Sequence, residues 1–501
     1  MLPAEEVEEL KSKLICSNCI GEKYLRELVG RTGVEETCSY CSDTAPCITV
    51  GRLSEHVSGA FEAHYVRTTN EPDALQWMMM KDDESDYDFE RSGEVTVEAI
   101  EMAAEVPTKA AEDVQQILED EYYDHSAAEM GEESEFAPDA YYERRGTSDA
   151  IWQEEWRAFE RSLKTEARFF SQFAAAHLRS VFAGIDDFRA SDGRPMVVQA
   201  GPGSGLSYLY RARAFQSEAK LLEAIKRPDL HIGPPPPGTA SHGRMNARGI
   251  SVFYGANSQR VAIAEVRPPV GSNVVVARFD IIRPLRLLDL TALRKVSVRG
   301  SIFDPSYADT LERGMFLRFL SQRITKPVMP DDEEMDYLAT QAVADFLATD
   351  GDQPFDGIIF PSAQVKTPRT VNVVLFQKAA RVEQLDLPQG SKISSSAGHH
   401  TNEGWEPQYS VTESVPPPPV DKKPKPSNDF PDFPDLSWRR TLGSYDDLES
   451  DGREVSLKTN HEDINVHHVS SAQFRTSKSS INRARHTDSR LASDTDSDSD
   501  F

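Results

Sequence analysis

Four cysteines near the start of the chain have the spacing of a metal-binding site. Cys16 and Cys19 form one pair with two residues between them, Cys38 and Cys41 form a second pair, and residues 20–37 separate the pairs. This spacing is typical of four-thiolate zinc sites, in which each pair supplies a tight turn and the metal closes the loop. Because such a closed site leaves no position for water, the zinc would be structural. The alternative is a set of unliganded thiols in a reducing compartment, and Cys47 is a spare thiol that could replace one ligand.

A second group of candidate residues lies in four short blocks further along the chain. The blocks are 209–213 with Arg211, 243–249 with Arg244 and Asn246 and followed by Tyr254, 262–266 with Glu265, and 356–362 with Ser362. Taken singly, each block has an ordinary structural interpretation, such as surface ion pairs, a core tyrosine or a turn serine. Glu265 is harder to explain in this way, because its neighbours are apolar and a carboxylate there costs free energy unless it has a partner or a task.

The hydrophobic pattern around these blocks predicts an α+β fold. Short β-rich runs begin at about residue 194, and two helical patterns lie between them, at 305–323 and 332–348. This mixed order, without regular alternation of strand and helix, favours α+β over a doubly wound sheet. Residues 51–193 have mostly helical periodicity, with helices over 53–64, 95–105 and 108–123 and an aromatic stripe near 150–185 that we interpret as core.

Composition limits the partners and the compartment. The chain has 501 residues and a formal charge of −27, so its surface repels nucleic acid and anionic lipid. The start of the chain lacks a signal-peptide pattern, and no run approaches the ~18 apolar residues of a membrane span. We therefore expect a soluble, cytoplasmic protein that binds neither nucleic acid nor membrane.

The sequence divides into four predicted regions. They are a zinc-binding segment (1–50), a helical module (51–193), a catalytic domain (194–387) and a tail (388–501). The tail contains the proline run 416–419 and ends in alternating Ser, Thr and Asp over 493–500. Because so few of its residues are apolar, we expect it to be disordered and dispensable for catalysis.

Taken together and in this order, the four blocks resemble the RES domain, a family named for its arginine, glutamate and serine. The resemblance covers about 180 residues and places the family pattern on Arg211, the 243–249 stretch, Tyr254, Glu265, Ser362 and Asn372. Met245 stands where the pattern favours tryptophan, and the long 277–355 region is expected to add helices. RES domains resemble ADP-ribosyltransferases in fold and degrade NAD, often as toxins paired with an antitoxin protein.

The resemblance implies an NAD-degrading enzyme that cleaves the nicotinamide–ribose bond. Glu265 would stabilise the oxocarbenium-like transition state, and Arg211 would bind the pyrophosphate or ribose. Tyr254 offers a ring face and Ser362 a hydroxyl that orients the substrate. Arg244 and Asn246 are further candidate substrate-binding residues. Arg213 is not ranked as catalytic.

The acceptor is left open by the sequence. Water would give a glycohydrolase, phosphate a phosphorylase, and a protein side chain an ADP-ribosyltransferase. No glycine-rich P-loop or dinucleotide fingerprint occurs, which disfavours hydride and phosphoryl transfer. The other alternative is a zinc-bearing interaction scaffold with an inactive RES-like domain.

The helical N-terminal region resembles the HEPN-type extensions that precede some RES domains. The arginine–histidine spacings available here, Arg52 with His56 and Arg168 with His177, do not fit the HEPN ribonuclease motif. We therefore expect no nuclease.

Overall fold

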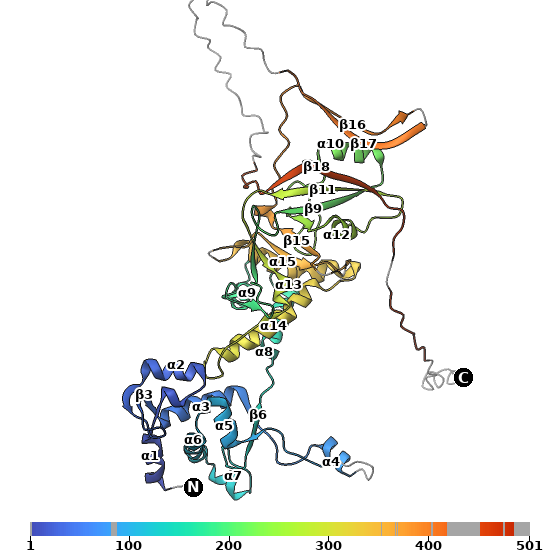
Figure 1. The fold of residues 1–501 in the computed structure, drawn as a ribbon. Coiled ribbons are helices and arrows are strands. Elements are labelled where there is room, and N and C mark those ends of the chain that lie inside the picture. Colours follow the sequence, from blue (N-terminus) through green and yellow to red (C-terminus); the bar gives the residue numbers. More distant parts are fainter. Residues whose placement is uncertain are drawn as a thin grey trace, which may run out of the picture.

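The computed structural model shows an N-terminal unit followed by a larger unit of mixed helix and sheet (Figure 1). It describes residues 3–81, 88–351, 353–365, 367, 369–401, 404–417, 451–473 and 476–484. Within these ranges, no helix is both long and apolar enough to cross a bilayer.

The N-terminal unit consists mainly of helices with two small antiparallel sheets, ordered β1-β3-β2 and β4-β6-β5. Its elements are α1 (Ala4–Ser12), β1 (Leu14–Cys16), η1 (Ser17–Cys19), α2 (Lys23–Thr32), β2 (Val34–Thr37), β3 (Thr44–Thr49), α3 (Val50–His64), β4 (Tyr65–Arg67), α4 (Ala74–Met80), β5 (Glu94–Val95), α5 (Thr96–Ala104), α6 (Thr108–Glu121), α7 (His125–Glu129) and β6 (Tyr141–Arg144). Helices α3, α5 and α6 match the three predicted over 53–64, 95–105 and 108–123. Residue 50 is not a domain boundary, because Ile15 and Leu25 share one core with Leu53.

The aromatic stripe near residue 150 belongs to the second unit. Helices α8 (Ala150–Thr165) and α9 (Gln172–Phe182) pack with α14 (Tyr307–Thr325) and α15 (Glu333–Thr349). Trp152 stacks on Phe316 with ring centroids 5.8 Å apart, and Trp156 and Phe159 are buried in the same cluster. The prediction that the stripe is core is right, but the boundary set at residue 193 is wrong, because these helices bury their apolar face against the second unit.

The second unit is organised by an eight-stranded sheet of order β18-β11-β9-β10-β15-β14-β12-β8. Only the β12–β14 pair is parallel. The strands are β8 (Val197–Ala200), β9 (Tyr208–Phe215), β10 (Phe253–Ala256), β11 (Asn273–Ile281), β12 (Leu285–Asp289), β14 (Gly357–Pro361), β15 (Val371–Leu375) and β18 (Leu457–His468). The mixed sheet with interspersed helices confirms the predicted α+β class.

The two faces of the sheet are covered by different elements. Val374 of β15 packs into the cluster of α8, α9, α14 and α15, whereas its neighbour Val373 packs into the cluster of α10, as strand alternation requires. The remaining elements of the unit are β7 (Arg189–Ala190), α10 (Glu218–Lys226), α11 (Pro228–His231), α12 (Gln259–Glu265), α13 (Leu290–Leu293), β13 (Val296–Ser297), η2 (Pro330–Asp332) and η3 (Gln377–Ala379).

The chain after residue 388 contributes structure, contrary to the predicted disordered tail. β16 (Lys392–Thr401) and β17 (Gly404–Ser414) form a hairpin, and β18 pairs antiparallel with β11 along its length. Composition did not predict these strands, because an edge strand is held by main-chain hydrogen bonds and needs few apolar residues. In β18, Leu457 is buried, and Ile464 and Val466 are partly buried. Part of the proline run 416–419, and the whole Ser/Asp-rich end 493–500, lie outside the described residues.

Candidate active site

A pocket opens where strands β9 and β10 diverge in the middle of the large sheet. The two strands are paired only at Ala256 and Tyr210, whereas β9 pairs with β11 over eight positions. The pocket has a volume of about 370 Å³, and Arg211, Tyr254 and Glu265 are among its lining residues. All four predicted blocks therefore reach one cavity, the fourth through Phe360 and Pro361, although Ser362 itself is not among the lining residues.

Glu265 is held by hydrogen bonds to one of its two carboxylate oxygens. Its Oε1 accepts from the Ser362 hydroxyl at 2.6 Å and from Asn372 Nδ2 at 2.9 Å. The Ser362 oxygen itself accepts from the backbone N–H groups of Gln364 (3.2 Å) and Val365 (3.1 Å), so its own proton is directed at the carboxylate. Ser362 and Asn372 are both buried, and they stand at the ends of the paired strands β14 and β15. This arrangement fixes the orientation of the carboxylate.

The second carboxylate oxygen of Glu265 is free to meet a ligand. Among the described residues, none bonds to Oε2, and Glu265 as a whole is exposed rather than partly buried as predicted. The reason is its position: α12 begins at Gln259, is capped by Ser258 and ends at Glu265, so Val261 and Ala262 face the core while the last residue faces the pocket.

Arg211 is a desolvated cation without an acidic partner. Its Nη1 donates to the carbonyl oxygen of Tyr254 at 3.0 Å, and its guanidinium lies 5.2 Å from the ring centre of Phe253. Burial lowers the pKa of Arg211 to about 10, which leaves it protonated at neutral pH. In the part of the chain that the structure describes, no carboxylate forms an ion pair with it. An uncompensated cation lining a cavity is expected to bind an anionic group.

Tyr254 and Asn246 have a different relation to the pocket. The Tyr254 hydroxyl donates to Asn246 Oδ1 at 2.9 Å and accepts from the Met245 N–H at 3.1 Å, so only the ring lines the cavity. Asn246 is buried, and its Nδ2 donates to three backbone carbonyls of the 241–250 loop. Asn246 therefore closes the loop on itself and supports Tyr254, and it is not among the residues that line the pocket. Its binding to substrate stays a prediction. Burial also raises the pKa of Tyr254 to about 12, so the phenol stays protonated.

One comparison with known proteins covers the part of the chain that contains Arg211, Tyr254 and Glu265. The family model described as RES domain matches residues 209–395. The chain carries a RES domain. No curated protein and no solved structure matches the chain. The RES match begins after the N-terminal unit, so the similarity of that unit to HEPN-type extensions stays a prediction.

Two other arginines line the pocket of the RES domain. Arg244 donates from Nη1 to the Ile324 carbonyl at 2.7 Å and lies 5.0 Å from the ring centre of Tyr337. Sequence reasoning missed Arg267, which follows α12 with φ of 42° and lines the same cavity. With its amide oxygen turned toward Arg267, Gln364 accepts from Nε (3.1 Å) and Nη2 (3.0 Å). The position of Arg267, two residues after Glu265, was the available signal.

The contacts of Asn372 were also not predicted from the sequence. The resemblance included Asn372 in the RES pattern without a role, but its amide donates to Glu265 and the residue lines the pocket. Its Oδ1 is buried and has no hydrogen-bond partner among the described residues. A buried oxygen without a donor is costly, so Asn372 Oδ1 carries a desolvation penalty that no described residue offsets. Met245, where the RES pattern favours tryptophan, fills the hydrophobic core.

The four paired cysteines form one cluster in the N-terminal unit, as predicted. Cys16 Sγ lies 3.6 Å from Cys41 Sγ, Cys19 Sγ lies 3.8 Å from Cys38 Sγ, and all four sulfurs lie within 4.8 Å of one another. A tetrahedral zinc with Zn–S bonds of about 2.3 Å separates its sulfurs by about 3.8 Å, so the cluster fits this ion. Cys47 is not part of it: its thiol donates to backbone carbonyls of Glu36 and Ala45.

Proposed function

We propose that the RES domain binds NAD in the pocket between β9 and β10 and cleaves its nicotinamide–ribose bond. The observation that carries this proposal is the pairing of two groups in one cavity. Glu265 presents an oriented carboxylate with one free oxygen, and Arg211 presents an unpaired cation. NAD offers a matching pair, a ribose carbon that becomes cationic and a pyrophosphate that is anionic.

The proposed reaction requires mainly electrostatic stabilisation from the protein. The bond between ribose C1′ and the pyridinium nitrogen breaks, and its electron pair goes to the nitrogen, which leaves as neutral nicotinamide without needing a proton. The ribose passes through an oxocarbenium-like state that Glu265 Oε2 would stabilise. Water or phosphate then forms the new bond to C1′. When water attacks, it releases a proton to solvent or to the carboxylate.

The other pocket residues would hold the substrate. Arg211 and Arg244 would bind phosphate oxygens, and the Tyr254 ring would pack against the nicotinamide or ribose. Asn372 would act through Glu265, because its amide donates to the carboxylate. Ser362 would act through Glu265, because its hydroxyl proton is already committed to the carboxylate.

The proposal includes the compartment, the partner and the metal inferred from the sequence. A cytoplasmic NAD-degrading enzyme of the toxin type would need a cognate antitoxin protein to restrain it. Zinc on Cys16, Cys19, Cys38 and Cys41 would close the 14–49 segment against the N-terminal core and take no part in the reaction.

The test is nicotinamide release by the purified full-length chain incubated with NAD, with and without phosphate. Release without phosphate indicates a glycohydrolase, and release that requires phosphate indicates a phosphorylase. Arg211→Ala should raise KM for NAD strongly, because a phosphate clamp acts on binding before chemistry. Arg213→Ala is the matched control, since Arg213 lies on the same strand, is exposed and donates to the His231 carbonyl outside the pocket. No nicotinamide release under either condition would refute the proposal and favour the scaffold alternative.

A further inference from the structure

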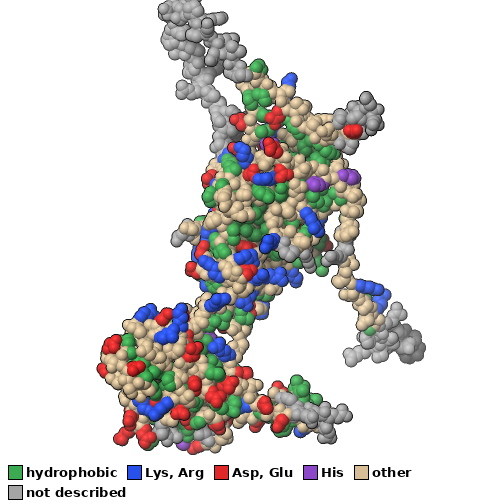
Figure 2. Space-filling view, viewed as in Figure 1, with side chains coloured by type: hydrophobic (Ala, Val, Ile, Leu, Met, Phe, Trp, Pro, Cys, Tyr) green, Lys and Arg blue, Asp and Glu red, His purple; other side chains and the backbone are tan. Residues whose placement is uncertain are grey.

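Helix α4 carries five large apolar side chains that the rest of the protein does not cover. In Figure 1 this helix stands away from α3, α5 and α6 on a projecting arm, whose described residues are 68–81 and 88–93, and Figure 2 shows hydrophobic side chains gathered on that arm. The exposed fractions are 65 % for Leu75, 47 % for Trp77, 70 % for Met78, 45 % for Met79 and 36 % for Met80. None of the seven residues of α4 is buried. Exposed clusters of large apolar residues mark interaction sites.

The helix is ordered by its own capping residues rather than by tertiary packing. The Asp73 side chain accepts from the backbone N–H groups of Leu75 and Gln76, both at 2.8 Å, and the Gln76 side chain accepts from the Asp73 N–H at 2.8 Å. This reciprocal capping box satisfies donors that a short helix otherwise leaves open. Leu75, Met78 and Met79 follow the i, i+3, i+4 spacing of one helical stripe, whereas Trp77 and Met80 lie on the opposite side of the helix. The short helix therefore presents large apolar side chains on both sides, as a helix enclosed in a groove would.

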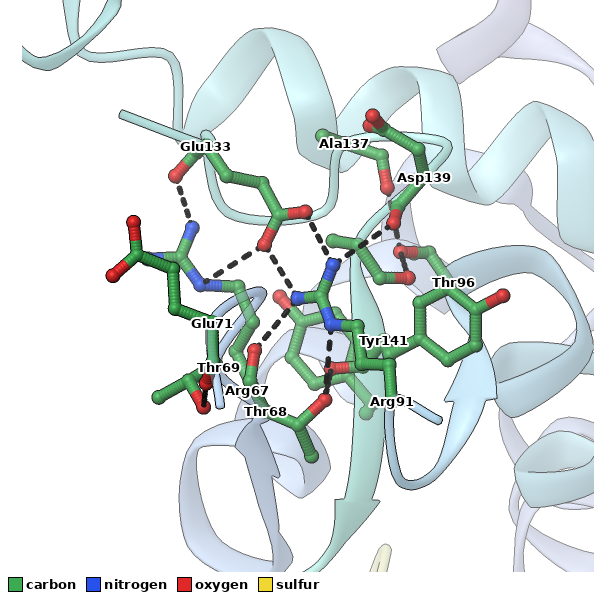
Figure 3. Close-up of polar contacts among 12 residues, drawn as sticks. Arg67, Thr68, Thr69, Glu71, Arg91, Thr96, Glu133, Ala137, Asp139 and Tyr141 are labelled. Atoms are coloured by element: carbon green, nitrogen blue, oxygen red, sulfur yellow. Dashed lines mark hydrogen bonds and ion pairs between the residues drawn. The ribbon is translucent and has the colours of Figure 1, made fainter. Parts of the chain in front are cut away.

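The base of the arm is locked to the N-terminal unit. Arg91 makes a two-pronged pair with Glu133, both hydrogen bonds at 2.6 Å, and also donates to the Thr68 carbonyl at 2.6 Å (Figure 3). Arg67 donates to the Glu133 carbonyl from the other side. The Arg91 and Glu133 side chains are only 13 % and 16 % exposed, so the pair is largely shielded from solvent. Because Arg91 also binds Thr68, these contacts hold the two ends of the arm together. The arm therefore has a fixed base and an apolar, uncovered helix.

We propose that α4 is a recognition helix that docks into an apolar groove of a partner protein whose rim carries Lys and Arg. Tryptophan and methionine are favoured at the centres of protein interfaces. The charge of the arm indicates what surrounds the partner's groove: the described residues 71–81 and 88–90 contain four Asp and Glu against one Lys, Lys81. The same charge disfavours an anionic membrane, nucleic acid, or the arm of a second copy of this chain.

The test places a photo-crosslinking residue at Met78 of the full-length chain in the cells that make it. The protein that it captures is then purified, and its affinity for the full-length chain is measured directly. We expect Trp77→Ala to weaken binding by about 30-fold, the loss typical of an interface hot spot. Met102→Ala is the matched control, because Met102 is 58 % exposed on α5, outside the arm. The affinity of the partner for the chain should fall as the salt concentration is raised, because ion pairs between acidic residues of the arm and Lys or Arg at the rim of the groove would be exposed to solvent.

Several results would overturn the proposal. Crosslinks only between copies of this chain would assign α4 to self-association. Co-sedimentation with phosphatidylglycerol vesicles, lost in Trp77→Ala, would assign it to a membrane. A captured protein that binds Trp77→Ala and the parent equally, or the absence of any saturable crosslink, would mean that α4 has no protein partner. None of these results depends on NAD turnover, so the two proposals fail separately.

Discussion

Replacing Glu265 by glutamine separates the charge of the carboxylate from its shape. The two hydrogen bonds to Oε1, from Ser362 at 2.6 Å and from Asn372 at 2.9 Å, can both be accepted by a glutamine carbonyl oxygen. The glutamine NH2 group is then turned to the pocket, where Oε2 stands in the parent. The ribose cation would meet a neutral donor in place of a negative charge. Fold and NAD affinity should therefore be retained while turnover is lost.

The expected size of the loss follows from what the carboxylate does. A preorganised electrostatic group of this kind contributes roughly 2.7–4 kcal/mol, or about 10²–10³ in rate. Ser362→Ala removes one of two hydrogen bonds to a charged acceptor, worth about 1.5–3 kcal/mol, so its loss should be smaller, about 10- to 10²-fold. The order of the two losses tests whether Ser362 acts through Glu265.

The assay is single-turnover nicotinamide release, with NAD affinity measured by calorimetry and thermal stability matched across variants. Glu218→Gln is the control, because Glu218 is an exposed glutamate in the first turn of α10 and does not line the pocket. Parent-like turnover by Glu265→Gln would show that the carboxylate is structural and would remove the centre of the mechanism. A greater loss in Ser362→Ala than in Glu265→Gln would show that the serine touches the substrate itself.

Three further predictions concern binding, stability and the metal. Burial lowers the pKa of Arg211 to about 10, so kcat/KM for NAD should fall as the pH rises through that value and the cation is lost. A pH–rate profile measures this fall. A value of kcat/KM that stays constant at alkaline pH would contradict the phosphate-binding role. A chain that ends at residue 450 lacks β18 and its buried Leu457. Loss of such a buried side chain lowers the free energy of unfolding by about 2–5 kcal/mol, so the melting temperature measured by calorimetry should fall by at least ~5 °C. An unchanged melting temperature would mean that β18 does not stabilise the domain. Elemental analysis should find about one zinc per chain, lost in Cys16→Ser/Cys38→Ser together with stability of the N-terminal unit; a metal-free parent of equal stability would exclude the site.

The residues of the site could be predicted from the sequence better than their contacts. Arg211, Glu265 and Tyr254 were grouped from separate blocks, and the structure brings them to one pocket. The sequence did not indicate that Glu265 is exposed. Five apolar neighbours suggested a sheltered side chain, but the last residue of a helix points past the core that its preceding turn makes. Burial of a terminal helical residue depends on where the helix stops, and sequence patterns define that point poorly.

Asn246 shows a second limit of reasoning from a motif. A polar residue in a conspicuous block suggests a ligand contact, but an asparagine amide can equally satisfy backbone groups in a tight loop. Here its four hydrogen bonds all go to the protein. Asn372 differs, because it lines the pocket and its oxygen is left without a donor among the described residues. The two asparagines differ in whether their amide groups have hydrogen-bond partners in the protein, and only the structure shows those partners.

The last strand shows why composition alone misplaces the end of the domain. β18 follows a long stretch of polar sequence, yet it continues the sheet at the edge formed by β11, because the backbone of β11 supplies the partners. Its register shifts between Ala277 and Arg278, and the extra residues at this irregularity project Asp463 back over the sheet. There Asp463 accepts from the Tyr210 hydroxyl at 2.9 Å and from the Gln259 amide at 3.2 Å. Since Tyr210 lines the pocket and Gln259 begins the helix that ends at Glu265, a residue well beyond the RES match at 209–395 braces two walls of the site.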